Sequence, residues 1–309
     1  MTGRPTLLVL RALYLGDLLT GLPALSLLRR GRPDHRIVLA APAQVGALAV
    51  LAGVVDELTP ARELEPLLAA PRGAQIAVDL HGNGPASRDL LAATRPGRLV
   101  AFAGGEHAWR PDEHEVTRWC RLVSEAFGLS GPWPGVGGSL PTLPSSGLPV
   151  ACTVIHPGAK AAARRWPADR FAAVARALVA AGHRVVITGG PGEEPLAREV
   201  ADAGGATALT GLRLSQLLAL IERAGLVICG DTGIAHVASA YRCPSVLLFG
   251  PVSPAHWGPP DDPRHRVLWH GDDSGDPQAG EPDPALLAIT VDEVLAALPT
   301  REQASPVAG

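Results

Sequence analysis

An aspartate follows the first apolar run of the chain, where a carboxylate could act as a general base. Residues 11–19 read Arg-Ala-Leu-Tyr-Leu-Gly-Asp-Leu-Leu, so Gly16 permits a tight turn and Asp17 falls at or near the first turn of a helix. Aspartate is a common helix N-cap, and a carboxylate facing a ligand can also accept the proton of a hydroxyl. Both interpretations of Asp17 are open at this point. The turn lacks the pattern G-x-G-x-x-G, which disfavours a dinucleotide-binding first domain.

Three cations follow another apolar run in the middle of the chain. Residues 153–160 read Thr-Val-Ile-His-Pro-Gly-Ala-Lys. Three alanines follow, and then Arg164, Arg165 and Trp166. Lys160 is the only lysine of the sequence. A glycine-containing loop with three cations between a strand and a helix can hold phosphate oxygens. The alternative is a solvated basic loop in which Trp166 packs at the start of the helix.

A glycine turn with an acidic end follows the run 185–188. Gly189 and Gly190 precede Glu193 and Glu194, which open a stretch with helical spacing. A carboxylate at such a turn can accept hydrogen bonds from a ribose diol or from the amino group of a base. Alternatively, both glutamates only complement the helix dipole.

The strongest local pattern is Gly-Asp-Thr-Gly at the end of the apolar run 226–229. Asp231, Thr232 and Gly233 stand where a buried strand passes directly into a helix. Backbone N–H groups at the helix start and the Thr232 hydroxyl can bind a diphosphate. His236 lies one helical turn further on the face of Thr232, so it can contact the same ligand. A buried histidine with a purely structural role is the alternative.

These residues require strands and helices that alternate along the whole chain. Runs rich in Val, Ile and Leu predict buried strands at 6–13, 37–40, 76–80, 99–102, 153–155, 184–188, 226–229 and 246–249. Helical spacing predicts helices at 18–30, 113–127, 168–181, 193–203, 214–224 and 234–241. Alternation of this kind is typical of the doubly wound α/β class with parallel sheets.

A segment rich in Gly, Pro and Ser at 128–149 predicts a linker between two domains, about 1–145 and 150–309. Two sheets facing a central cleft would bring the carboxyl ends of their strands to one ligand. We also expect a mobile acidic loop at 271–284, a C-terminal helix at about 285–298 and a frayed tail at 300–309. The aspartate pairs at 261–262 and 272–273 are expected to face solvent and to bind no metal.

Composition excludes several classes of protein. With 47% hydrophobic and 18% charged residues the chain is globular, and its net charge of −3 gives no basic surface for nucleic acid. The four widely spaced cysteines predict reduced thiols of a cytoplasmic protein. No window is long and apolar enough to predict a signal peptide or a membrane span, although peripheral membrane contact is compatible with the sequence.

Taken together and in this order, the motifs resemble glycosyltransferase family 9, the heptosyltransferases that act on the lipopolysaccharide core. The motifs span about residues 7–260, which is most of the chain. The matching pieces are Gly16-Asp17, Leu22-Pro23-Ala24-Leu25, Asp79-Leu80-His81-Gly82-Asn83, His156-Pro157-Gly158-Ala159, Arg164-Arg165-Trp166-Pro167, Gly189-Gly190 with Glu193, Leu209-Thr210-Gly211 and Asp231-Thr232-Gly233-Ile234-Ala235-His236. The segment 289–294 also resembles the start of the family's C-terminal helix.

The resemblance implies a GT-B fold, two Rossmann-like domains with an N-terminal acceptor domain and a C-terminal donor domain. It implies inverting transfer without a metal or other cofactor, usually from ADP-heptose. Asp17 matches the family's catalytic base, and Glu193, with Gly189 and Gly190, matches the nucleoside site. Asp231, Thr232, Gly233 and His236 match the donor-binding motif.

Arg164 departs from the family pattern, because it stands where the family usually has a phosphate-binding lysine. Guanidinium and ammonium groups are not interchangeable at a fitted site. Lys160 could supply the ammonium group, with Arg165 as a further cation.

The acceptor is expected to contact the first domain, and its identity is left open: a glycan, a lipid-linked glycan or a natural product. Candidate contacts are Arg11, Asn83, Arg88 and His114, with His107 and Arg118 in the same segment as His114. Two alternatives to transfer remain. One is a sugar-nucleotide epimerase of the GT-B type, and the other is a non-catalytic member that binds a nucleotide or a partner protein.

Overall fold

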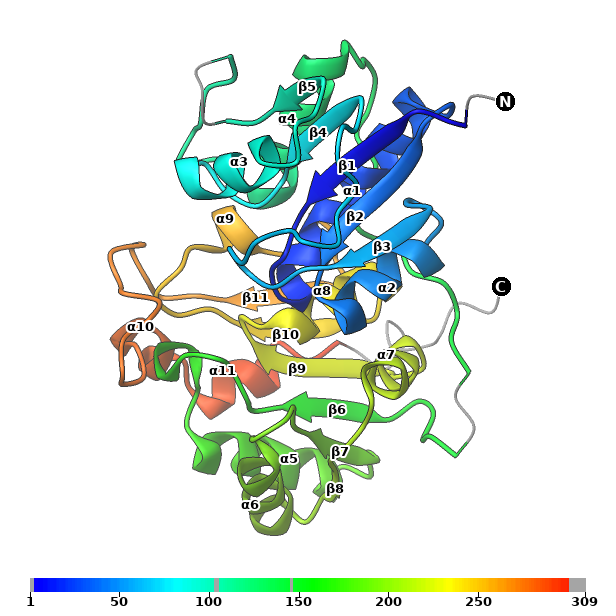
Figure 1. The fold of residues 1–309 in the computed structure, drawn as a ribbon. Helices are drawn as coiled ribbons and strands as arrows, with labels where there is room; N and C mark the ends of the chain where they lie inside the picture. The colour runs from blue at the N-terminus through cyan, green and yellow to red at the C-terminus, as the bar shows by residue number, and fades with distance from the viewer. Residues whose placement is uncertain (1–2, 103–105, 145–146, 300–309) are drawn as a thin grey trace. The chain divides into compact units, whose positions relative to one another are not determined.

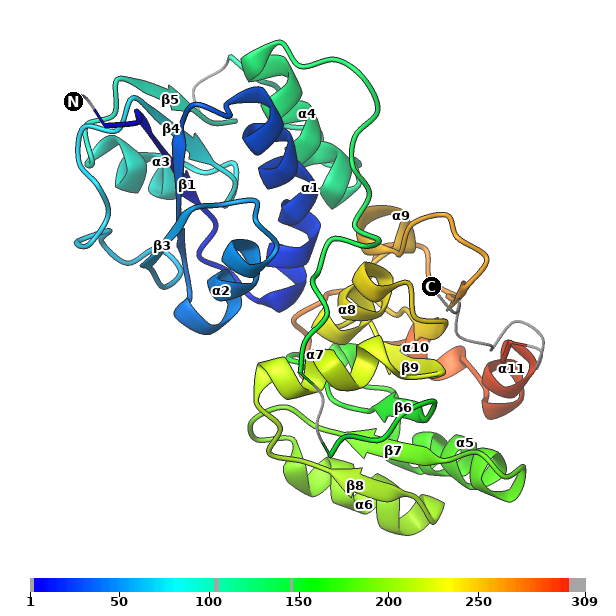
Figure 2. The same cartoon turned by 90° about the vertical axis from the view of Figure 1, so that its right-hand side faces the viewer.

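The computed structural model describes residues 3–102, 106–144 and 147–299, in which the chain forms two compact units, Met1–Pro141 and Thr142–Gly309. We call them unit 1 and unit 2. Their boundary falls inside the segment 128–149 that is rich in Gly and Pro. Each unit is built on one sheet whose strands are all parallel (Figures 1 and 2).

Unit 1 has a five-stranded sheet in the order β3-β2-β1-β4-β5. Its strands are β1 (Thr6–Leu10), β2 (Arg36–Ala41), β3 (Glu57–Pro60), β4 (Ile76–Asp79) and β5 (Arg98–Val100). Its helices are α1 (Leu15–Gly31), α2 (Ala43–Leu51), α3 (Pro85–Ala92) and α4 (Glu115–Phe127). Helices α1 and α4 pack side by side on one face of the sheet, and α3 lies on the other, as Figure 2 shows.

Unit 2 has a six-stranded sheet in the order β11-β10-β9-β6-β7-β8. Its strands are β6 (Thr153–His156), β7 (Val185–Thr188), β8 (Thr207–Leu209), β9 (Leu226–Gly230), β10 (Ser245–Leu248) and β11 (His265–Leu268). Its α-helices are α5 (Ala168–Ala180), α6 (Glu194–Gly204), α7 (Leu214–Glu222), α8 (Gly233–Tyr241), α9 (Pro254–Trp257), α10 (Pro284–Ala288) and α11 (Val291–Ala296). A short 3-10 helix, Ala162–Arg164, follows β6.

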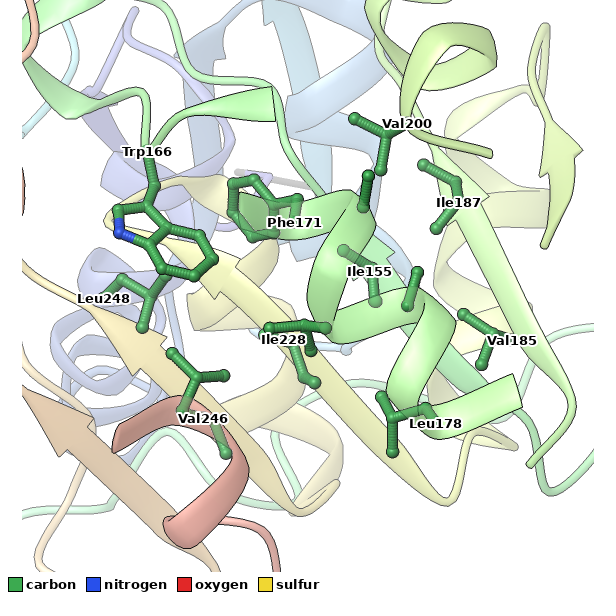
Figure 3. Packing of buried hydrophobic residues seen from close by; sticks show 14 of the residues in the cluster. Ile155, Trp166, Phe171, Leu178, Val185, Ile187, Val200, Ile228, Val246 and Leu248 are labelled. Atoms are coloured by element: carbon green, nitrogen blue, oxygen red, sulfur yellow. The ribbon is translucent and has the colours of Figure 1, made fainter. Parts of the chain in front are cut away.

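One face of the unit 2 sheet carries a hydrophobic core under α5, α6 and the C-terminal helices (Figure 3). Trp166 and Phe171 pack edge to face at 5.0 Å against residues of β6, β9 and β10. The Trp166 Nε1–H donates to the Ile289 carbonyl at 3.1 Å. Trp166 therefore fixes the end of the basic loop 157–165. Its packing at the start of α5 agrees with the alternative interpretation of this segment in the sequence analysis.

The predicted α/β class is confirmed, and every predicted strand is present within a few residues. The first strand ends at Leu10 instead of residue 13: the Arg11 N–H makes a last bond to the Ala40 carbonyl of β2, and the chain turns away from the sheet after it. Elements that the sequence analysis missed are β3, β8, β11, α2, α3 and α9. The helix predicted at 285–298 is two helices, since Thr290 caps α11 and accepts a hydrogen bond from the Glu293 N–H.

The segment 271–284 differs from the predicted mobile loop, because hydrogen bonds hold it to unit 2. Asp273 Oδ1 accepts from the Ser253 N–H at 2.7 Å and Oδ2 lies 3.3 Å from His256 Nδ1, so Asp273 anchors the loop while it remains exposed to solvent, as predicted. The Ala163 N–H donates to the Ala279 carbonyl. The predicted frayed tail, 300–309, lies outside the described residues. Within the described part, none of the helices is long and apolar enough to cross a bilayer.

Candidate functional site

The strand order reverses once in each sheet, and the predicted site residues gather at these reversals. In unit 1 the reversal lies between β1 and β4, and in unit 2 it lies between β6 and β9. Loops after two such strands diverge, and open α/β sheets bind their ligands at the carboxyl ends of the strands there. The loops at these places are 11–14 and 80–84 in unit 1, and 157–167 and 231–232 in unit 2.

Asp17 lies in the first turn of α1, beside the reversal in unit 1. Its Oδ2 accepts a hydrogen bond from the N–H of Tyr14 at 3.2 Å. Tyr14 is the N-cap residue of α1, so the Asp17 carboxylate caps the start of its own helix. The side chain is half-buried, and Oδ1 has no protein partner in the part of the chain that the structure describes. The two interpretations of Asp17 are therefore compatible, because one oxygen caps while the other is open to a ligand.

Arg11 is fully buried and holds the turn that carries Asp17. Its guanidinium donates to the carbonyls of Asp17 and Leu80, and to Thr20 Oγ1 at 3.1 Å. Glu115 balances the charge, with Oε1 3.3 Å from Arg11 Nη2. Gly21 leaves room for the Arg11 side chain, since a Cβ there would lie 2.6 Å from Nε. We therefore assign Arg11 a positioning role instead of the predicted contact with an acceptor.

Glu115, which the sequence analysis did not single out, joins the two sides of this network. Its carboxylate accepts from Arg11, from Arg118 and from Trp119 Nε1 at 2.6 Å. Arg118 also donates to three backbone carbonyls of residues 110–113, so its side chain is structural. Arg118 and Trp119 stand three and four residues after Glu115 in the predicted helix, so their spacing could have indicated the contact, whereas the bond to Arg11 leaves no signal in the local sequence.

The other residues predicted to contact the acceptor differ in how far their side chains are exposed and in the hydrogen bonds that they already make. Asn83 is exposed in the loop after β4, and Arg88 lies on α3, 3.6 Å from Asp89 Oδ1, with 44% of its side chain exposed. His114 is the N-cap of α4, because its Nδ1 accepts from the Val116 N–H at 3.2 Å. This bond gives His114 a structural role that the acceptor prediction did not include.

In unit 2, Asp231 and Arg164 meet at the reversal between β6 and β9. Asp231 is buried, and its Oδ2 lies 3.5 Å from Arg164 Nη1, so Asp231 orients the guanidinium. Arg164 Nε is buried without a protein partner among the described residues. Gly230 allows a close approach here, because a Cβ would lie 3.0 Å from the Arg164 carbonyl oxygen. The cation is thus held beside the start of α8.

Helix α8 begins with the predicted anion site. Thr232 is its N-cap, and Thr232 Oγ1 accepts from the Ile234 N–H at 3.3 Å. Gly233 is the first residue of the helix. His236 is buried one turn later, and its ring packs edge to face against Trp257 at 6.1 Å. The structure thus places Arg164, Asp231, Thr232 and Gly233 together.

The other two cations of the basic loop are exposed. Arg165 Nε donates to the Ala159 carbonyl at 2.7 Å, which leaves the end of its guanidinium in solvent. Lys160 is exposed in the loop after β6. Both therefore lie on the loop that carries Arg164, as the sequence predicted.

Glu193 lies between the loops after β6 and β7. Its Oε2 accepts from the Gly190 N–H at 2.8 Å and lies 3.4 Å from His156 Nε2. The hydrogen bond with His156 and that from Gly190 hold the pKa of the Glu193 carboxyl below its usual range. Gly158 packs directly on this carboxylate, where a Cβ would overlap it, and Gly189 packs on the Glu193 backbone. Glu193 is therefore an ionised acceptor at the carboxyl ends of β6 and β7.

Surface hollows, possible metal ligands and thiols lie outside the loops described so far. Hollows of about 320 Å³ and 230 Å³ lie at the edge strands β3 and β11, and none of the predicted site residues lines them. The described residues contain no group of three or more His, Cys, Asp or Glu side chains that could hold a metal ion. The four thiols are buried, and burial raises the pKa of Cys120 and of Cys243 to about 12, so they are poor nucleophiles.

Comparison with known sequences and structures decides the family. The sequence model described as glycosyltransferase family 9 (heptosyltransferase) matches residues 92–285, more than half of the chain. The chain belongs to glycosyltransferase family 9. The matched region includes every predicted site residue of unit 2.

Three relatives illustrate what this family 9 chain is similar to. It is 37% identical to lipopolysaccharide heptosyltransferase 3 of Escherichia coli over 125 residues, 38% of this chain and only 36% of that protein. The crystal structure of a family 9 glycosyl transferase from Veillonella parvula has 20% identity and a TM-score of 0.78, over 96% of this chain and 97% of that one. ADP-heptose lps heptosyltransferase II of E. coli has 21% identity and a TM-score of 0.75, over 94% and 97%. The likeness in structure shows the predicted GT-B fold, with its two Rossmann-like units.

Proposed function

We propose that this family 9 chain is an inverting glycosyltransferase that transfers a heptose-like sugar from ADP-heptose to a hydroxyl of a glycan or natural-product acceptor. The predicted N-terminal domain (about 1–145), which corresponds to unit 1, would bind the acceptor, and the predicted C-terminal domain (about 150–309), which corresponds to unit 2, would bind the donor. The observation that carries the proposal is the Arg164–Asp231 pair beside the start of α8, which provides a fixed cation and a helix N-terminus for a diphosphate.

In the proposed reaction Asp17 is the base. Its carboxylate takes the proton of the acceptor hydroxyl while that oxygen forms a bond to the anomeric carbon. The bond from the anomeric carbon to the diphosphate oxygen breaks on the opposite face, and its electron pair leaves with the diphosphate. Attack opposite the leaving group inverts the anomeric configuration. The step requires the acceptor held by unit 1 and the donor held by unit 2 to meet.

The charge that develops on the diphosphate would be stabilised by Thr232, Gly233 and Arg164, with Lys160 and Arg165 as further cations. These groups supply positive charge without a metal, so we propose a metal-independent reaction. Glu193 would accept hydrogen bonds from the nucleoside, with Gly189 and Gly190 leaving room for it, and His236 would line the same site. Because all four thiols are buried and unpaired, we also propose a reducing, cytoplasmic location.

The test is a thermal-shift panel of ADP-, GDP-, UDP- and dTDP-sugars with the whole chain. A ligand that binds only the native state stabilises it by about 2.7 kcal/mol at a hundredfold excess over Kd. We expect ADP-heptose to raise the unfolding midpoint most. A larger shift with another nucleotide would overturn the proposed donor. ADP-heptose is then incubated without acceptor, and formation of an isomer would indicate an epimerase instead.

The lysine of the basic loop gives a further prediction. Lys160→Ala should raise the KM for the donor several-fold, because one cation near the diphosphate is lost. Kinetics at varied donor concentration measure the change. Arg176→Ala is the matched control, since Arg176 lies on α5 and donates only to the Ala203 carbonyl in the described structure. An unchanged donor KM in Lys160→Ala would assign the phosphate contact to Arg164 alone.

A further inference from the structure

The loop after β4 carries an imidazole that has no role so far. β1 and β4 are neighbours in register, with Leu10 opposite Asp79, so His81 emerges beside the turn that leads to Asp17. Asp79 fixes this loop: its buried carboxylate accepts from the His81 N–H at 2.9 Å and from Ser87 Oγ at 2.7 Å. Its pKa is raised by burial. The backbone at His81 is therefore rigidly placed.

The His81 ring is oriented by a backbone donor. The Ala12 N–H donates to His81 Nδ1 at 3.2 Å. A ring nitrogen that accepts a hydrogen bond carries no proton, so the proton of the neutral imidazole is on Nε2. Nε2 has no protein partner in the described part of the chain, and the side chain is half-buried. The Nε2–H of His81 is therefore a hydrogen-bond donor with a fixed orientation, and it is available to a ligand.

Charged groups on three other segments surround this imidazole. Burial lowers the pKa of His81, and the Arg11 charge lowers it further, whereas the Asp17 and Glu63 carboxylates raise it. The net effect is a lowered pKa, so the ring is neutral at neutral pH. Both side chains also bond to the turn 11–14, His81 through the Ala12 N–H and Asp17 through the Tyr14 N–H, so they lie against the same loop of unit 1.

We propose that His81 binds the acceptor, with its Nε2–H donating to a saccharide oxygen next to the hydroxyl that Asp17 deprotonates. A carboxylate that only accepts and an imidazole that only donates match two adjacent oxygens of a sugar ring, one of which gives up its proton. The acceptor site thus selects a saccharide with vicinal oxygens over an isolated alcohol. This inference rests on the proposed function of Asp17.

Two substitutions separate the two nitrogens of the ring. His81→Asn places an oxygen where Nδ1 lies, so it keeps the bond from the Ala12 N–H and loses the outer donor. His81→Gln places an amide N–H near the position of Nε2. We expect His81→Asn to raise the acceptor KM about 3- to 10-fold, the effect of one hydrogen bond, with an unchanged donor KM. His81→Gln should show a smaller increase.

The assay uses ADP-heptose with deacylated lipopolysaccharide core as the acceptor. His183→Asn makes the same change at an exposed histidine of unit 2 and should leave both KM values unchanged. In the wild type, the acceptor KM should also rise as the pH falls through the lowered pKa of His81, because protonation of Nδ1 breaks the bond from Ala12. His81→Asn should lack this acid limb.

Two results would overturn the proposal. One is a wild-type acceptor KM in His81→Asn, and the other is an equal loss in both variants together with a lower unfolding midpoint, which would indicate a structural role. Failure of the proposed function is distinguishable from these. If Asp17→Asn keeps full turnover while His81→Asn raises the acceptor KM, Asp17 is not the base and the acceptor contact of His81 stands.

Discussion

Asp17→Asn should lower the rate of sugar transfer by about 10²- to 10⁴-fold and leave the affinity for the donor nearly unchanged. The amide cannot take the proton of the acceptor hydroxyl. Its oxygen can still accept from the Tyr14 N–H, so the cap of α1 is kept. The donor is expected to bind unit 2, which contains no part of this turn. Turnover measured at saturating substrates, with donor binding measured separately by thermal shift, tests both statements.

Asp89→Asn is the control for this substitution. Asp89 lies on α3, where 68% of its side chain is exposed, so the same loss of charge occurs on unit 1 away from the turn. It should retain wild-type turnover. Full turnover in Asp17→Asn and in Asp17→Ala would reject Asp17 as the base. A fall in unfolding midpoint equal to the loss of a helix cap, with turnover retained, would leave Asp17 only its structural role.

The central strands could be predicted because burial on both faces leaves a continuous apolar run. Every residue of β6, β7, β9 and β10 is buried, and the sequence analysis found all four. The missed strands β3, β8 and β11 lie at or near sheet edges, where half-exposed positions interrupt the run. Their positions follow only from pairing with a neighbour, which one sequence does not show.

The site could be predicted where chemistry follows directly from local order. Gly-Asp-Thr-Gly after a strand predicted a helix start with Thr232 as its cap, and the structure has both. Roles that depend on distant partners could not be predicted. Arg11 was predicted as an acceptor contact, but its guanidinium bonds to Glu115, which lies 104 residues later in the sequence. His81 was quoted in a motif, and only the bond from Ala12 shows which of its nitrogens is open.

Glu115→Ala should destabilise unit 1 by about 3–5 kcal/mol, because it leaves two buried guanidinium groups without their carboxylate. The Arg11 side chain is 0% exposed, and those of Glu115 and Arg118 are each 7% exposed. Burial of an unpaired charge costs more than the pair itself contributes. The Trp119 Nε1–H also loses its acceptor. Urea denaturation of the whole chain, followed by far-UV circular dichroism, should show an earlier first transition.

Glu57→Ala is the matched control, because it removes a carboxylate from an ion pair with Arg36 whose members are 52% and 42% exposed. A surface pair contributes less than about 1 kcal/mol, so this variant should unfold like the wild type. The Glu115 variant should also turn over more slowly than the control even where it is folded, since Arg11 holds the Asp17 carbonyl. Equal stability of the two variants would mean that backbone carbonyls are sufficient to stabilise the buried guanidinium groups of Arg11 and Arg118 without the Glu115 carboxylate. These carbonyls belong to Asp17, Leu80 and residues 110–113. In that case Glu115 would not be what fixes the turn of the proposed base.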